Sequence, residues 1–138
     1  MTGRSIFAAA LSAMMAVGAV TVRVQDDEGA GWQIPADASR EVNPIAVSDQ
    51  VISKGREIYR SKCRRCHGPA GHGDGPDADS KDEPGNLSDP RRAARNPDGV
   101  MFYKIWNGRT NPKMPAFKSE LARAEVWTVI QYVKTLRK

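Results

Sequence analysis

The stretch Cys63-Arg64-Arg65-Cys66-His67 decides how this chain folds and what it binds. Its two cysteines are the only ones in the sequence, two residues separate them, and a histidine directly follows the second. This spacing sets the sulfurs about one helical turn apart, so that each thiol can add across one vinyl group of a haem. A ring nitrogen of His67 can then bind the iron as the proximal ligand. The pattern predicts one c-type haem, covalently bound through Cys63 and Cys66.

Three other uses of the two cysteines stay open at this point. A redox-active dithiol has the same spacing, but the surrounding sequence lacks the strand-then-helix pattern of a thioredoxin-like unit. A zinc site would also need His72, and the adjacent Cys66 and His67 would have to occupy two corners of one tetrahedron. A structural disulfide suits an exported protein but gives His67 no role. The haem interpretation is the one that uses every residue of the motif.

The N-terminal residues 1–22 have the pattern of a targeting segment. A positively charged start precedes an uncharged run, residues 5–22, that is mostly Ala, Val and Met. We expect either a cleaved signal peptide or a retained N-terminal anchor formed by residues 5–22. Both forms predict an exported, periplasmic protein, in agreement with a haem that bacteria attach outside the cytoplasm.

One domain with appendages is expected from a chain of 138 residues. Residues 23–47 are predicted to form an irregular lead-in or linker because they contain Gly and X-Pro signals that disfavour helix. Whether Trp32 and Ile34 pack on the domain or belong to a loose tether is left open. The domain itself is predicted at residues 48–138.

Three helices are predicted within this domain, and no strand pattern is present. The first begins near Ser48, a good N-cap, and carries an apolar stripe formed by Val51, Ile52, Gly55, Ile58 and Tyr59. The second covers residues 98–106 and the last covers about 122–136. Residues 68–97 lack amphipathic periodicity and predict a long loop around the haem edge. The fold class is therefore all-α, with three to four helices around one haem.

Met114 is the best candidate for a second axial ligand of the iron. It lies between Pro112 and Pro115, which restrict the backbone on both sides and favour an extended loop. Met101 lies in a helical apolar stripe and is predicted to belong to the core. His72 follows the haem motif so closely that it cannot easily reach the opposite haem face, and we expect it at the surface.

The sequence is basic, with a formal net charge of +5. Lys62, Arg64 and Arg65 lie beside the haem motif. These residues can form ordinary solvated surface, or they can steer the protein toward an acidic surface on a redox partner. Nothing in the sequence resembles a nucleic-acid-binding motif, and contact with a membrane is expected only if the N-terminal segment is retained.

Taken together, these motifs resemble the class I, single-haem c-type cytochromes over about residues 48–138. The matching positions occur in the family's order: Gly55 and Tyr59, the Cys63 to Gly68 motif, Gly71 to Pro76, Asn86-Leu87, Asp89-Pro90, Trp106 to Gly108, Met114 to Phe117, then Trp127 and Tyr132. The resemblance implies an all-α domain whose first and last helices cross. Gly55 would lie at that crossing and face Trp127 or Tyr132.

The resemblance also implies the ligand set. His67 would be the proximal ligand and Met114 the distal one, and the backbone carbonyl of Pro76 would accept a hydrogen bond from the other His67 nitrogen. The sequence departs from the family pattern at Ala122, three residues before Glu125. Similar members place Ser or Thr there to complete a capping box, and its loss would weaken the last helix without affecting the haem.

Iron with histidine and methionine ligands has no open position for a substrate. We therefore expect an electron carrier that cycles between ferric and ferrous states, and not an enzyme in its own right. Two alternatives use the haem differently: an electron-transfer subunit of a larger periplasmic dehydrogenase or oxidase, or a five-coordinate haem protein that binds or reduces a small ligand such as peroxide. A thiol oxidoreductase without haem is the remaining alternative.

Overall fold

The computed structural model describes residues 32–81, 83–111 and 113–137. Within these ranges it contains one 3-10 helix and five α-helices: η1 (Ala38–Arg40), α1 (Asp49–Lys62), α2 (Arg64–His67), α3 (Pro90–Arg95), α4 (Asp98–Asn107) and α5 (Arg123–Thr135). The described residues form no strand beyond one isolated bridge, which confirms the all-α prediction. The predicted targeting segment at 1–22 and Pro112 lie outside these ranges. None of the helices described is long and apolar enough to cross a membrane.

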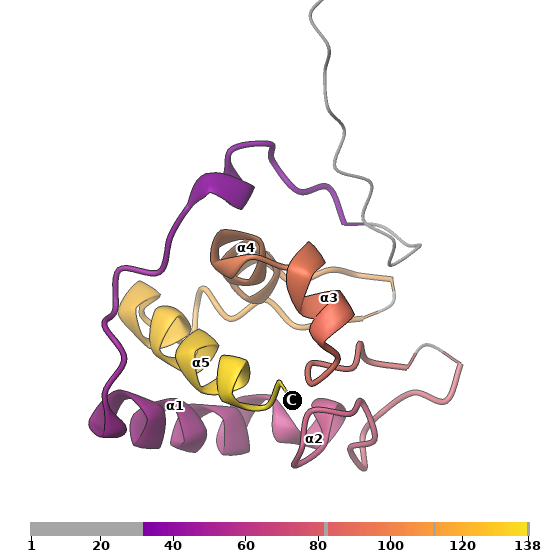
Figure 1. Ribbon diagram of the computed structural model, residues 1–138. Helices are drawn as coiled ribbons and strands as arrows, with labels where there is room; N and C mark the ends of the chain where they lie inside the picture. The colour runs from indigo at the N-terminus through magenta and orange to yellow at the C-terminus, as the bar shows by residue number, and fades with distance from the viewer. Residues whose placement is uncertain (1–31, 82, 112, 138) are drawn as a thin grey trace, which may run out of the picture.

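Helices α1 and α5 cross at Gly55, where a side chain would prevent the approach (Figure 1). A Cβ atom built on Gly55 would lie 2.6 Å from the backbone oxygen of Thr128 and 2.8 Å from Cβ of Tyr132. Next to the crossing, the rings of Tyr59 and Tyr132 lie 5.3 Å apart. The structure thus confirms the predicted crossing and assigns the facing aromatic residue as Tyr132.

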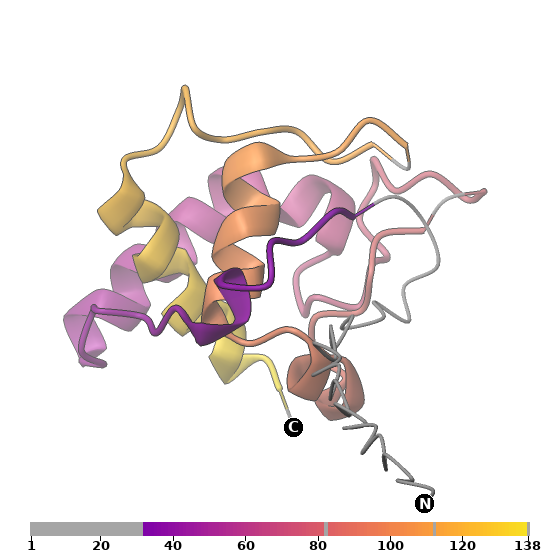
Figure 2. The same cartoon turned by 90° about the horizontal axis from the view of Figure 1, so that it is seen from above.

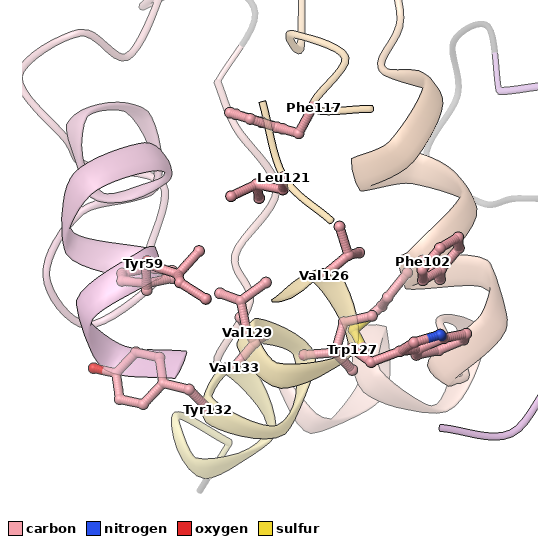
Figure 3. Close-up of a cluster of buried hydrophobic side chains, with 12 residues drawn as sticks. Tyr59, Phe102, Phe117, Leu121, Val126, Trp127, Val129, Tyr132 and Val133 are labelled. Carbon is pink, nitrogen blue, oxygen red and sulfur yellow. The ribbon is translucent and has the colours of Figure 1, made fainter. Parts of the chain in front are cut away.

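The hydrophobic core lies between α1, α4 and α5 (Figure 3). Its buried members are Ile58, Tyr59, Met101, Phe102, Phe117, Leu121, Val126, Trp127, Val129, Ile130, Tyr132 and Val133. Helix α4 packs on α5 through Phe102 and Trp127, whose stacked rings are 4.2 Å apart. The periodic apolar positions of the three long helices therefore form one core, as their spacing predicted.

Helix α3 lies inside the stretch for which the sequence predicted only loop. Asp89 caps its start, because its side-chain oxygen accepts a hydrogen bond of 2.9 Å from the Arg91 amide, and Pro90 occupies the first turn. That backbone hydrogen bond is the main reason why the pKa of Asp89 lies below its usual value. An aspartate N-cap followed by proline is a recognised start signal. A helix of six residues is too short to produce amphipathic periodicity, which explains why the prediction was wrong here.

Residues 32–47, called the N-terminal strap below, run around the outer side of α4 and α5 before α1 begins (Figures 1 and 2). The Asn43 side chain donates a 2.8 Å hydrogen bond to the Trp127 carbonyl, and the Gln131 side chain donates one of 2.5 Å to the Ile45 carbonyl. η1 contacts α4. The strap is therefore packed on the helical domain, a question that the sequence left open.

Candidate haem site

The Cys63 to His67 motif forms a tight turn at the end of α1. The Cys63 amide donates to the Tyr59 carbonyl as the C-cap of α1, and the His67 amide then donates to the Cys63 carbonyl over 2.9 Å, closing the single turn of α2. Cys63 and Cys66 are free thiols and not a disulfide. Both cysteines thus lie on one helical turn, the arrangement that two neighbouring thioether bonds require.

The loop that follows the motif folds back onto α2. The Gly75 amide donates a 3.1 Å hydrogen bond to the Cys66 carbonyl, and the Asp77 amide donates a 2.8 Å hydrogen bond to the Arg65 carbonyl. The Asp77 carboxylate also forms an ion pair with the Arg65 guanidinium, at 2.7 Å. These contacts satisfy carbonyls at the open end of a very short helix and so fix the motif's backbone.

His67 faces a carbonyl that the sequence did not identify. Its Nδ1 lies 3.3 Å from the Gly85 carbonyl oxygen, so Gly85 takes the place that the family resemblance gave to Pro76. A carbonyl can only accept, so this hydrogen bond requires the proton on Nδ1 and leaves the ring's lone pair on Nε2. The Pro84-Gly85 dipeptide signals a turn, but a turn signal does not reveal which distant side chain its carbonyl faces.

Met114 lies in the loop between α4 and α5, whose backbone is held by hydrogen bonds. The Arg109 amide donates a 2.9 Å hydrogen bond to the Met114 carbonyl, and the Met114 amide donates a 3.0 Å hydrogen bond to the Arg109 carbonyl. The loop starts at Gly108, whose φ is +60° and where an added Cβ atom would overlap the backbone oxygen of Met114. After Met114, the Phe117 amide donates a 3.1 Å hydrogen bond to the Ile105 carbonyl of α4. Backbone hydrogen bonds therefore hold the loop both at Met114 itself and at Phe117.

One cavity brings the predicted haem residues together from separate parts of the chain. Cys63, Cys66, His67 and Met114 all line it. Met101, predicted as core, is buried and also reaches the wall, whereas His72 is exposed and lies outside the lining, as does Pro76. Apolar side chains from separate segments complete part of the wall, which suits a large flat apolar group: Tyr59, Leu87, Ile105, Phe117 and Val133.

The charges of the wall have a single sign. Six cationic residues line the cavity, namely Lys62, Arg92, Lys104, Arg109, Lys113 and Arg137, and the described lining contains no aspartate or glutamate. Lys104 is only 7% exposed, and within the described part of the chain the buried Arg137 Nε has no hydrogen-bond partner. Burial lowers the pKa of Arg137. A bound anion is attracted by cationic side chains at a partly apolar cavity, so this wall fits a haem, whose two propionates are anionic.

The site is less suited to the two other uses of the cysteines, as a redox-active dithiol or as a zinc site. Burial, with a smaller contribution from Cys66, raises the pKa of the Cys63 thiol to about 12, so its reactive thiolate is scarce at neutral pH. Across the described ranges, no three His, Cys, Asp or Glu residues are grouped so that they can hold a metal ion. Neither a fast dithiol exchange site nor a zinc site is favoured by this geometry.

Two solved structures have a fold similar to this one, and one of them is named a c-type cytochrome. The structure is similar to the c-type cytochrome KustC0563, with a TM-score of 0.52 and 24% identity, covering 61% of this chain and 98% of that chain. It is also similar to a chain of the Kuenenia stuttgartiensis reducing HAO-like protein complex Kustc0457/Kustc0458, with a TM-score of 0.57 and 26% identity. That match covers 69% of this chain but 47% of the other, so this chain spans about half of its length.

The chain has no match among the curated proteins. The family model described as cytochrome c oxidase, cbb3-type, subunit III matches residues 50–133, a range that includes every predicted haem residue. A c-type cytochrome domain implies covalently bound haem c. Since the match covers more than half of the chain, this protein belongs to that family of c-type cytochromes.

Proposed function

We propose that this protein is a periplasmic electron carrier with one c-type haem attached to Cys63 and Cys66, and with His67 and Met114 as its axial ligands. The observation that carries the proposal is their convergence on one cavity, although Met114 is far from the others in sequence. The bound haem would supply a one-electron couple between ferric and ferrous iron. A periplasmic location is proposed because haem of this type is attached outside the cytoplasm.

The protein's own residues support this chemistry by fixing the two proposed ligands. The hydrogen bond to the Gly85 carbonyl favours the His67 tautomer with its lone pair on Nε2, and it would make this nitrogen a more basic ligand for the haem iron. The Arg109–Met114 backbone pair holds the loop that presents the Met114 thioether. Met114 as a thioether ligand would raise the reduction potential of the haem, and iron held by both His67 and Met114 would have no open position for a substrate. We therefore propose a carrier and not an enzyme in its own right.

Partner recognition is proposed to use the basic rim of the cavity. Two of the basic residues beside the motif are ion-paired within the protein: Lys62 with Glu120 at 2.7 Å and Arg65 with Asp77 at 2.7 Å. Exposed Lys113, at the edge of this wall, is therefore the better candidate for contact with an acidic redox partner.

A second candidate function is that of an electron-transfer subunit in a larger periplasmic oxidase or dehydrogenase. Two observations favour it: the matching family model describes an oxidase subunit, and one similar chain belongs to a protein complex. Purification of the exported protein under mild conditions distinguishes the two functions. A carrier elutes alone with its haem, whereas a subunit elutes with stoichiometric partners.

Absorption spectra of the haem-loaded protein, ferric and ferrous, with and without carbon monoxide, test the ligand set. We expect a low-spin spectrum that carbon monoxide does not change. In Met114→Ala we expect carbon monoxide to change the spectrum, because the iron would lose the ligand proposed at Met114. Met101→Leu, at the other methionine of the wall, is the matched control and should not respond. If the unaltered protein binds carbon monoxide, the proposed carrier function is wrong and a ligand-binding function takes its place. A colourless protein would refute the proposal that haem is bound.

A further inference from the structure

Trp32 is the first described residue of the N-terminal strap, and it lines the same cavity as the proposed haem residues. Its indole ring contacts two of the wall's cations. Lys104 Nζ lies 5.3 Å from the ring centroid, and Arg109 Cζ lies 4.8 Å from it. A tryptophan face attracts a cation at such distances, more strongly when water is excluded. The strap thus brings one aromatic ring against both cations at the cavity.

The strap is held in place by contacts far from the cavity. Asn43 bonds to the Trp127 carbonyl, and Gln131 bonds to the Ile45 carbonyl. At the outer edge of the strap, Arg123 and Glu41 form an ion pair of 3.3 Å. Since its C-terminal half is tied to α5 and η1 contacts α4, the path of the strap directs its other end toward the cavity.

The two cations are themselves attached to fixed backbone. Lys104 belongs to α4, and its Nζ donates a 2.7 Å hydrogen bond to the Asn96 side chain. Arg109 pairs through its backbone with Met114. Long cationic side chains normally extend into water, but here both head groups lie beside an indole ring that also forms part of the cavity wall. Trp32 therefore favours positions in which their charge stays at the cavity.

We propose that Trp32 is a positioning residue: it covers this part of the cavity and holds the charges of Lys104 and Arg109 at its wall, which raises the reduction potential of the haem. This inference rests on the proposed function. Positive charge near the haem favours the ferrous form, which carries one positive charge fewer than the ferric form. Exclusion of water favours the ferrous form for the same reason, and burial is a recognised control of haem potential. Both effects act in the same direction.

Spectroelectrochemical titration of the haem-loaded protein at fixed pH and ionic strength tests the proposal. We expect Trp32→Ala to lower the equilibrium constant for reduction about tenfold, which is about 59 mV for a one-electron couple. Trp32→Phe, which keeps a smaller aromatic face, should lower it less. Gln33→Ala, at the exposed neighbouring residue, is the control and should not change it. If Trp32→Ala fails to fold, the comparison of Trp32→Phe with the control decides alone.

A double-mutant cycle separates positioning from a general loosening of the domain. Lys104→Met should lower the reduction potential. Trp32→Ala should lower the potential less in the Lys104→Met variant than in the unaltered protein. Unchanged potentials in the Trp32 variants, or fully additive changes, would overturn the inference. A protein without covalent haem would instead refute the proposed function, so the two failures are distinguishable from the absorption spectrum.

Discussion

Replacement of Gly55 by alanine tests whether the contact between α1 and α5 holds the domain together. The added Cβ would lie 2.6 Å from the Thr128 oxygen and 2.8 Å from Tyr132 Cβ. Both neighbours belong to or adjoin the α5 backbone, so no side-chain rotation relieves the overlap. Overpacking typically costs about 1–3 kcal/mol, and the upper end applies because two helices must separate. Alanine recovers up to about 1 kcal/mol of helix propensity, which leaves a net loss of about 2 kcal/mol.

Urea unfolding of the haem-loaded protein, followed by far-ultraviolet circular dichroism, measures this loss. Ser53→Ala is the matched control, because Ser53 is exposed in the same helix. Its effect should stay within about 0.5 kcal/mol, the range typical of surface substitutions. If Gly55→Ala is as stable as the unaltered protein, the helices do not need this close approach and the reasoning from the crossing fails.

Three further predictions concern the last helix, Tyr59 and the charges. Ala122→Ser should stabilise α5 by about 1 kcal/mol, since Glu125 already accepts the Ala122 amide at 2.9 Å and serine supplies the missing half of the capping box; urea unfolding without a gain would contradict it. Burial raises the pKa of Tyr59, so its contribution to stability is complete below about pH 10 and falls at higher pH, where the unfolded chain ionises first. Tyr59→Phe should flatten that decline in unfolding titrations, and an unchanged pH profile would exclude Tyr59 as its source. Electron transfer to an acidic redox partner should slow as salt rises in stopped-flow measurements, and a rate independent of salt would remove the proposed steering.

The parts of this structure that the sequence could predict depend on local or strongly constrained features. The haem motif is read from five consecutive residues because two thioether bonds and one ligand need a fixed spacing. Gly55 stands out because an apolar helical stripe has no other reason to contain glycine. Met114 stands out because the prolines around it favour an extended loop, where a methionine is not expected to belong to a helical core. For each of these positions, the residues that explain it lie within a short stretch of sequence.

The remaining parts of the site arise from contacts between distant segments. Gly85 lies 18 residues after His67, and only the folded loop brings its carbonyl to the imidazole. Lys104 follows the pattern of an ordinary helical residue, yet it is 7% exposed, and its Nζ lies 5.3 Å from the centroid of the Trp32 ring of the strap. The position of Trp32 depends in turn on Asn43 and Ile45, whose partners lie on α5. No local pattern contains this information.

The single sign of charge in the cavity wall links the fold to its proposed cofactor. The buried Nε of Arg137 has no hydrogen-bond partner in the described part of the chain, so its burial opposes folding, although Asp98 attracts the guanidinium. An anionic haem in the cavity would convert that cost into attraction, so it would stabilise the folded state as any ligand does that binds only the folded chain. A freely exchanging haem would provide this only while its concentration exceeded its dissociation constant. The proposed attachment through Cys63 and Cys66 would make the anion part of the same molecule, so a domain with such a wall would benefit from a covalent haem.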